Sequence, residues 1–182
     1  MKILHIITSM NKGGAESFLY KLSIQSNKND NIQIFIITLL EAGYYKNLLQ
    51  NNNIKIYSLN LKNKFLIIFY ILNLIHLIKS IKPDVIQTWM YHSSLIGGLI
   101  GKFLGIKNII WTIRHGKLII FKSKFTTIIT NYFLIILSKF IPSKIVYCSN
   151  SSKIIHENLG YNKNISNIIY NGFNFKEFSI NS

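Results

Sequence analysis

The chain has 182 residues, of which 49% are hydrophobic and only 15% are charged, and 21 lysines and arginines against 6 acidic residues give a formal net charge of +15. This length indicates one domain, and so apolar a chain can bury a core that offsets its ordering entropy, which excludes intrinsic disorder. The single cysteine excludes a disulfide framework, and no group of Cys and His residues has zinc-ligand spacing, so we expect one compact cytoplasmic domain.

Short runs of apolar, largely β-branched residues recur along the chain and predict buried strands. The first begins directly after Met1, so we expect no signal peptide. A tight glycine turn at Gly13 and Gly14 follows it. The predicted strands are Lys2–Ser9, Ile32–Leu40, Ile54–Leu59, Val85–Trp89, Asn108–Ile113, Lys144–Ser149 and Ile165–Tyr170.

The segments between these strands carry apolar residues at helical spacing. The helix predicted at about 64–81 ends before Pro83, because proline restricts the backbone of the residue that precedes it. Ser149 or Ser151 is expected to cap a last helix that runs to about Gly160. The other predicted helices are Ala15–Ser26, Tyr44–Asn53 and His92–Leu104.

Strands that are apolar throughout and alternate with helices are typical of a parallel sheet covered on both faces. The predicted fold class is therefore α/β, a doubly wound, Rossmann-like parallel sheet of about seven strands in a single domain. Ligands of such open sheets bind outside the carboxyl ends of the strands, near the point where the strand order reverses. Candidate site residues are therefore those that follow strands.

The positive charge is carried almost entirely by lysine, because Arg114 is the only arginine. Such a charge favours anionic partners such as anionic lipids and nucleotide phosphates, although a general bias toward Lys, Asn and Ile explains it without any partner. Specific nucleic-acid recognition usually uses arginine, and neither a basic helix nor an aromatic-interleaved basic motif is present. We expect no nucleic-acid partner.

Two apolar stretches bear on membrane association. Phe65–Ile78 is shorter than the ~20 residues that span a bilayer and contains Asn73 and His76, so it is predicted to be a buried core helix. Leu118–Ile141 is interrupted by lysines and an asparagine. Its lysines and aromatic residues suit a helix on an anionic membrane surface, and an ordinary docking helix explains them equally well.

The first cluster at a strand end is Gly13-Gly14-Ala15-Glu16. Glycines let the backbone approach a ligand closely, and the start of a helix offers unpaired N–H groups to a phosphate. The cluster is neither a dinucleotide-binding fingerprint nor a Walker motif. Glu16 has a simpler explanation, since an acidic residue in the first turn complements the helix dipole.

Two more clusters have structural explanations beside functional ones. After the fourth predicted strand, His92 is a candidate for ligand contact or for capping the next helix. In that helix, Gly97 and Gly98 are predicted to allow close packing on the sheet. After the sixth strand, Ser149 is a candidate helix cap, with ligand contact as the alternative.

The most informative cluster is Arg114-His115-Gly116, after the fifth predicted strand. The chain places its only arginine beside a histidine at a strand's carboxyl end. Histidine serves as a general base or hydrogen-bond partner near neutral pH. The alternative is a loop pair with no special role.

The remaining reactive residue types form no site by spacing. Cys148 lies in an apolar predicted strand and is interpreted as an inert core residue. His5, His76 and His156 lie in predicted strands or helices and are interpreted as structural. The acidic residues are scattered, so neither a carboxylate pair nor a metal site is predicted.

Taken together and in chain order, the motifs at the strand ends resemble the amino-terminal domain of glycosyltransferases of family 4. These enzymes have the two-domain GT-B fold. The resemblance covers essentially the whole chain. One departure is Asn174, where the family usually has aspartate. The matching segments are 1–9 with 13–16, 82–89 with His92 and Gly97-Gly98, 111–115, 146–149, and 168–174 with Phe178.

The resemblance implies a retaining, metal-independent transfer of a sugar from a nucleotide-sugar donor to a glycan or lipid-linked acceptor, in surface polysaccharide or glycoconjugate synthesis. No cofactor is implied besides the donor. Residues 1–172 correspond to the acceptor-binding domain and 173–182 to the start of the crossover to a donor-binding domain that the 182 residues do not include. Because the basic phosphate clamp belongs to that domain, we expect the chain to be inactive alone.

The resemblance also implies roles for single residues. His115 corresponds to a catalytic residue next to the transferred sugar, and Arg114 shapes the acceptor side. The other expected cleft residues are Gly13 and Gly14, at the donor phosphate or sugar, and Glu16, His92 and Ser149.

Two other functions are kept as alternatives. One is a non-catalytic membrane-surface or partner-binding module derived from such an enzyme. For the enzyme and for this module alike, the expected location is the cytoplasm, with a peripheral position at the inner face of the membrane as a further possibility. The other is a stand-alone nucleotide-binding domain, which is weaker because no ribose-binding acid follows the glycine turn at the expected distance; Glu41 is the nearest candidate.

Overall fold

The structure is a computed structural model that describes residues 1–61, 63–114 and 125–172. Within these residues, seven parallel strands form one sheet in the order β3-β2-β1-β4-β5-β6-β7, which confirms the predicted fold class. The strands are β1 (Lys2–Ile7), β2 (Gln33–Thr38), β3 (Lys55–Ser58), β4 (Val85–Trp89), β5 (Ile109–Ile113), β6 (Lys144–Tyr147) and β7 (Ser166–Ile168).

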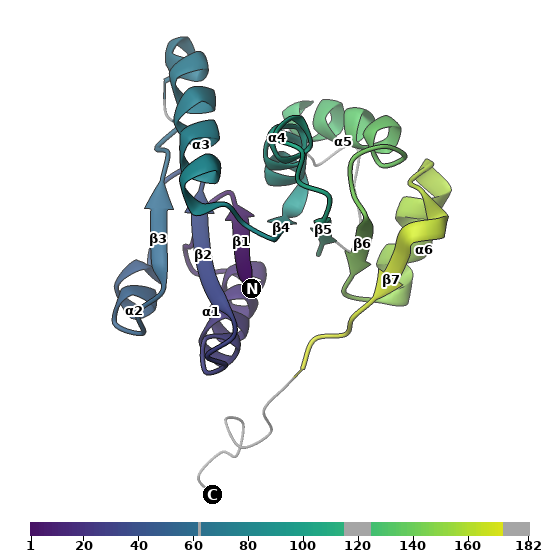
Figure 1. Ribbon diagram of the computed structural model, residues 1–182. Helices are drawn as coiled ribbons and strands as arrows, with labels where there is room; N and C mark the ends of the chain where they lie inside the picture. The colour runs from purple at the N-terminus through teal and green to yellow at the C-terminus, as the bar shows by residue number, and fades with distance from the viewer. Residues whose placement is uncertain (62, 115–124, 173–182) are drawn as a thin grey trace, which may run out of the picture.

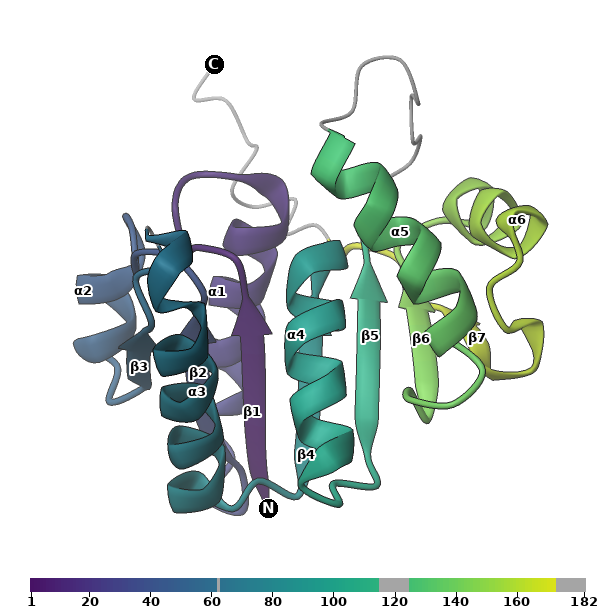
Figure 2. The same ribbon diagram turned by 90° about the horizontal axis from the view of Figure 1, so that it is seen from above.

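Helices cover both faces of the sheet. Figure 1 shows α1 and α2 on one face and α3, α4 and α5 on the other, and Figure 2 shows the latter three side by side in front of the strands. The helices are α1 (Gly14–Ser26), α2 (Lys46–Gln50), α3 (Ile67–Ile81), α4 (Met90–Phe103), α5 (Phe125–Leu137) and α6 (Asn150–Leu159), with 3₁₀ turns η1 (Lys64–Leu66) and η2 (Lys163–Ile165).

The direction of strand addition reverses between β1 and β4. On one side β1 pairs with β2, and on the other Ile3 lies opposite Val85 and Ile6 opposite Thr88 of β4. Ligands bind at such a reversal in open α/β sheets, outside the carboxyl ends of the strands. The segments that follow β1, β4, β5 and β6 therefore frame the candidate site.

The core lies in two layers because successive side chains of a strand point to opposite faces. In β1, Leu4 and Ile6 pack in a buried cluster with Leu74 of α3, whereas Ile7 packs in another with Leu19 of α1. Each fully buried aliphatic side chain contributes about 1.5–3 kcal/mol. The continuous apolar character of β1 thus reflects two cores.

Glycines in α4 let this helix lie close to the sheet, as predicted. A Cβ at Gly97 would lie 2.8 Å from Cδ1 of Ile6 and 3.2 Å from Cγ2 of Thr88. A Cβ at Gly98 would lie 2.9 Å from Nε1 of Trp111. Side chains at these positions would push α4 away from β1, β4 and β5.

Substitution of Gly98 by alanine is expected to destabilise the fold by about 1–2 kcal/mol, because overpacking against the rigid, buried Trp111 ring outweighs alanine's better helix propensity. Thermal unfolding followed by circular dichroism measures this. Gly14→Ala is the matched control, since a Cβ at Gly14 meets no atom within 4 Å. Equal melting temperatures for the two variants would contradict the packing argument.

Two predicted helix properties are wrong. Helix α4 begins at Met90 rather than at His92, because Met90 adopts a left-handed φ of 70° that turns β4 directly into the helix. The predicted burial of Phe65–Ile78 holds for only one side of α3, which buries Leu74 and Ile78 and leaves Phe69 and other large side chains exposed. Helix length and composition do not reveal which sides of an apolar helix are covered.

The second apolar stretch contains α5, which packs against α4 as a docking helix does. Residues 118–124 of the stretch lie outside the described residues. In the part of the chain that the structure describes, no helix is long and apolar enough to cross a membrane.

Candidate functional site

The glycine cluster begins α1 at the reversal of strand order. Gly13 is the N-cap residue, and no side chain caps this helix end. Gly13 and Gly14 are exposed. The backbone N–H groups of the first turn therefore lack a side-chain cap, and such N–H groups at helix N-termini bind phosphate or carboxylate groups.

Glu16 lies in the first turn of α1, and its carboxylate folds back over Gly13, where a Cβ would lie 2.9 Å from the Glu16 Cδ. A negative charge there complements the positive end of the helix dipole. This position supports the structural explanation of Glu16. A ligand phosphate at the same helix end would lie beside this carboxylate.

Two hydroxyl pairs join the first turns of α4 to the sheet, one from the segment after β1 and one from β4. Thr8 Oγ1 lies 3.4 Å from Ser93 Oγ, and Thr88 Oγ1 lies 2.9 Å from the buried Ser94 Oγ. These contacts link the carboxyl ends of β1 and β4 to the part of α4 that carries His92, which is half-buried. His92 is therefore placed inside the first turn of α4, and the prediction that it caps the helix is wrong.

Arg114 follows β5 and is held by aromatic rings. Its guanidinium carbon lies 3.9 Å from the ring centroid of Phe18 and 5.6 Å from that of Trp89, which are cation–π distances. It also donates a hydrogen bond to Oδ1 of Asn171. Burial lowers the pKa of Arg114 from its usual value. The arginine thus ties β5 to α1, β4 and the segment after β7.

A cavity of about 290 Å³ lies beside Arg114 on the α1 face of the sheet. Within it, Gln87 donates a 2.8 Å hydrogen bond to Thr112 Oγ1. Cys148 is half-buried in the cavity wall directly after β6, so its interpretation as a core strand residue is wrong. The lining residues are Phe18, Leu22, Gln87, Trp89, Ile110, Thr112, Arg114, Val146, Tyr147, Cys148 and Ile169.

Ser149 caps α6, as predicted. Its Oγ accepts a 3.1 Å hydrogen bond from the Ser152 N–H and lies 3.0 Å from Ser151 Oγ. A helix cap of this kind contributes about 1 kcal/mol. The structure brings Gly13, Gly14, Glu16, His92, Arg114 and Ser149 to the same edge of the sheet, whereas His115 lies outside the described residues.

His5 and Trp89 form a buried pair that sequence reasoning missed, since no local motif signals a contact between two parallel strands. Trp89 Nε1 donates to Nδ1 of His5 over 3.3 Å. His5 is 2% exposed, and burial lowers its pKa to about 3. The histidine is thus a neutral acceptor that orients the indole beside Arg114.

Stability is expected to fall as the pH decreases below about 6.5, because the unfolded chain then binds a proton at His5 that the folded chain does not. From pH 7 to 5 this one group removes about 2 kcal/mol. Urea unfolding at both pH values measures the loss, and His5→Gln is expected to reduce it. His76→Gln, at an exposed position, is the control. An unchanged pH dependence in the His5 variant would refute the assignment.

Buried histidine His156 is structural, as predicted. Its Nδ1 lies 2.7 Å from the Ser152 carbonyl oxygen, which only accepts, so Nδ1 carries the proton. Nε2 therefore accepts from the Tyr91 hydroxyl at 2.7 Å. Burial raises the pKa of Tyr91, which keeps this hydroxyl protonated. The network anchors α6 to the first turn of α4.

Metal binding has no support among the side chains that the structure describes. No group of three or more His, Cys, Asp or Glu residues in the described ranges lies close enough to hold a metal ion. The expectation of metal-independent chemistry rests on the resemblance alone and stays a prediction.

The seven-stranded parallel sheet, with its strand reversal between β1 and β4 and helices on both faces, matches the amino-terminal, Rossmann-like half of GT-B proteins. The profile of Glycosyltransferase Family 4 matches residues 12–177, and the chain belongs to this family. No match is found among curated proteins.

Solved structures agree with this fold. HepE of Anabaena, solved in complex with UDP, has a TM-score of 0.74 and 17% identity over 97% of this chain and 45% of its own. The lipopolysaccharide outer core galactosyltransferase WaaB has a TM-score of 0.67 and 17% identity, over 95% of this chain and 46% of its own. MurG of Acinetobacter baumannii has a TM-score of 0.64 and 15% identity, again over 95% and 46%. The chain therefore spans about half the length of the proteins that it resembles.

Proposed function

We propose that this chain is the acceptor-binding half of a retaining, metal-independent glycosyltransferase. It would act with a donor-binding domain to transfer a sugar from a nucleotide-sugar to a glycan or lipid-linked acceptor in surface polysaccharide or glycoconjugate synthesis. The proposed location is the cytoplasm, at the inner face of the membrane. Residues 1–172 would form the acceptor-binding domain, and 173–182 would begin the crossover to the donor-binding domain.

The observation that carries the proposal is the exposed, uncapped start of α1 at the strand reversal. Nucleotide-sugars carry a diphosphate, and helix N-termini bind phosphates through backbone N–H groups. The HepE crystals contain UDP and UDP-glucose. Family membership favours transfer over the reaction of UDP-GlcNAc 2-epimerases, whose Methanocaldococcus jannaschii member shares the fold with a TM-score of 0.64 and 15% identity.

In this proposal, both domains contribute positive groups that bind the nucleotide diphosphate. The departing nucleotide diphosphate needs preorganised positive groups, and the α1 N-terminus supplies only a partial charge of about +0.5. The lysine-rich chain adds a general attraction for the anionic donor. A donor-binding domain, whether in the same or a separate polypeptide, would supply the stronger cationic contacts.

The test is the Gly14→Val variant in a protein that combines this chain with its donor-binding domain. Open space surrounds Gly14, and its φ is not left-handed, so valine fits the fold but occupies the space beside the helix N-terminus. Nucleotide release from a panel of nucleotide-sugars, with lipid-linked and glycan acceptors, is expected to fall about tenfold. A folded variant with parental turnover would overturn the placement of the donor.

The non-catalytic alternative predicts a different result. A binding module derived from such an enzyme would release no nucleotide from any donor, even when joined to the donor-binding domain. The gene sequence beyond the codon for Ser182 distinguishes the transferase from the non-catalytic module directly. An adjacent or continuing frame that encodes a Rossmann-like domain with a basic clamp and paired carboxylates supports the transferase.

A further inference from the structure

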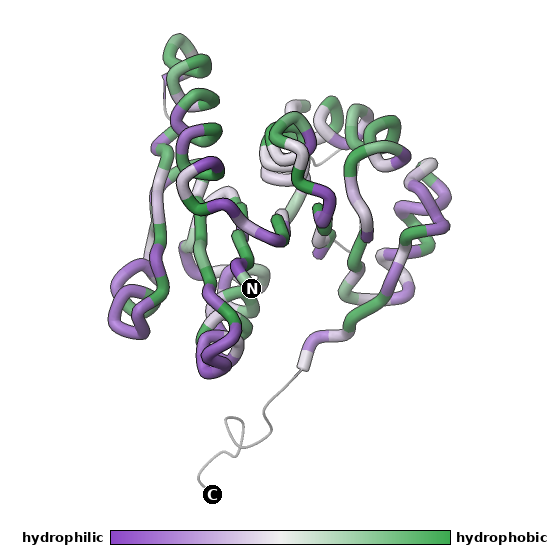
Figure 3. Tube along the Cα trace, in the orientation of Figure 1, coloured by the Kyte–Doolittle hydropathy of each residue, from purple (hydrophilic) through white to green (hydrophobic). Residues whose placement is uncertain are grey.

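The α3 helix exposes far more apolar surface than a helix of a monomeric domain usually does. Phe65 in η1 is 97% exposed, and Ile68 and Phe69 in α3 are 70% and 62% exposed. Figure 3 shows that most of this helix is hydrophobic, with a few hydrophilic residues between the hydrophobic ones. Large exposed apolar patches mark interaction sites.

The exposed apolar residues continue on the neighbouring helices of the same face of the sheet. Figures 1 and 2 show α3, α4 and α5 in one layer. We call this layer the apolar helix face. Its exposed large side chains are Phe65, Leu66, Ile67, Ile68, Phe69, Ile71, Leu72, Leu99, Phe103, Phe125, Ile129, Tyr132, Phe133 and Ile136.

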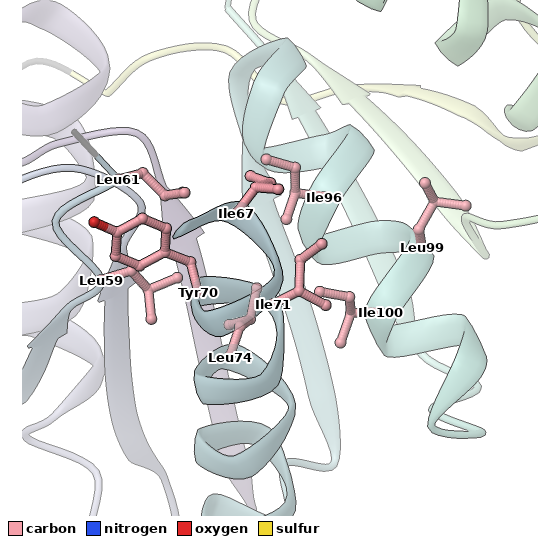
Figure 4. Close-up of a pocket in the computed structure, with 9 residues that line it drawn as sticks. All are labelled: Leu59, Leu61, Ile67, Tyr70, Ile71, Leu74, Ile96, Leu99 and Ile100. Atoms are coloured by element: carbon pink, nitrogen blue, oxygen red, sulfur yellow. The ribbon is translucent and has the colours of Figure 1, made fainter. Parts of the chain in front are cut away.

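A pocket of about 220 Å³ opens between α3 and α4 in this face (Figure 4). Eight of its nine lining residues are leucine or isoleucine, and the ninth is Tyr70, whose hydroxyl points away from Ile96 and Ile100 in the figure. Burial of a sugar or phosphate without hydrogen-bond partners costs free energy, so a pocket with this apolar lining favours a hydrocarbon ligand. The lining residues are Leu59, Leu61, Ile67, Tyr70, Ile71, Leu74, Ile96, Leu99 and Ile100.

The charge of the face selects an anionic partner. None of the six acidic residues of the chain lies in η1, α3, α4 or α5. Exposed lysines lie on or just after the same helices, at Lys79 in the last turn of α3, at Lys102 in the last turn of α4 and at Lys139 after α5. A second copy of this chain would bring like charges together, whereas an anionic bilayer offers both hydrocarbon and negative charge.

We propose that the apolar helix face docks on an anionic lipid bilayer and that the pocket between α3 and α4 takes one hydrocarbon chain of a bilayer lipid. Phe65, Ile68 and Phe69 enter the boundary of the acyl chains, and the lysines meet the lipid phosphates. The inference does not depend on sugar transfer, because its test measures binding to vesicles.

Vesicle co-sedimentation of the chain tests the surface. We expect binding to phosphatidylglycerol-containing vesicles at least tenfold tighter than to pure phosphatidylcholine vesicles, and weaker in high salt. The double variant Phe69→Ser, Leu72→Ser changes exposed residues and is expected to reduce binding at least tenfold. Leu48→Ser, in α2 on the opposite face of the sheet, is the control and should bind as the parent does.

Photo-crosslinking tests the pocket independently of any loss of folding. Vesicles that contain a phospholipid with a diazirine in its acyl chain are expected to label peptides that cover residues 67–74 and 96–100. Labelling of α5 alone would overturn the pocket assignment. Absence of binding to anionic vesicles, or a stable dimer that buries α3 in solution, would overturn the membrane face and the proposed location at the membrane. Neither result would affect the proposed sugar transfer, which is measured by nucleotide release.

Discussion

Replacement of His115 by alanine, in an enzyme that joins this chain to a donor-binding domain, is expected to lower turnover at least tenfold without a change in folding. The family resemblance implies that His115 lies next to the transferred sugar. General acid–base or positioning groups typically contribute about 10²–10⁴-fold. Initial rates of nucleotide release in the presence of acceptor measure the effect.

Arg114, the residue before His115, lies at the carboxyl end of β5, where the candidate site is expected. His115 directly follows Arg114, whose guanidinium is held against Phe18 and Trp89 at the carboxyl end of β5. His76→Ala, on the exposed side of α3, controls for the general loss of a histidine. Turnover within twofold of the parent in the His115 variant would remove this residue from the catalytic site.

Replacement of His156 by alanine is expected to have the largest effect on stability, about 3 kcal/mol. The ring is fully buried and packs against Tyr147 and Tyr161 at centroid distances of 5.5 Å and 5.3 Å. Its removal leaves a cavity and deprives the Tyr91 hydroxyl of its acceptor. A change of this size lowers the melting temperature by roughly 6–12 °C in a chain of this length.

Two variants separate the contributions to this effect. Tyr91→Phe keeps the packing but removes the donor to His156 Nε2, so we expect about half the loss. His76→Ala, at an exposed position, is expected to stay within about 0.5 kcal/mol of the parent. If His156→Ala and His76→Ala have the same melting temperature, the buried network does not anchor α6.

The strands were predictable because burial on both faces leaves a continuous apolar run in the sequence. Val85–Trp89 was predicted with the boundaries that the structure shows, and Lys2–Ser9 extends only two residues beyond the observed β1. Helix packing was predictable where glycine was the signal, as at Gly97 and Gly98. These features are local, so the sequence around each residue carries the information.

The missed features depend on residues far apart in the chain. Arg114 lies against Phe18, almost a hundred positions earlier, and the His5–Trp89 pair joins strands that three α-helices and two strands separate in the chain. The exposed side of α3 was missed for the same reason, since its apolar composition is equally consistent with a covered helix. The edge of the sheet that carries the candidate site was predictable, whereas the contacts of its residues required the tertiary arrangement.

The place of β1 in the sheet has a consequence for folding during synthesis. Ile3 pairs with Ile34 on one side and with Val85 on the other, and these two partners leave the ribosome at different times. At about 5–20 residues per second, β4 follows β1 after roughly 4–16 s. During that interval one edge of β1, an interior strand of the finished sheet, has no hydrogen-bonding neighbour, a state prone to aggregation. We therefore expect that shielding of the nascent chain, by the ribosome surface or a chaperone, limits aggregation until β4 pairs with β1.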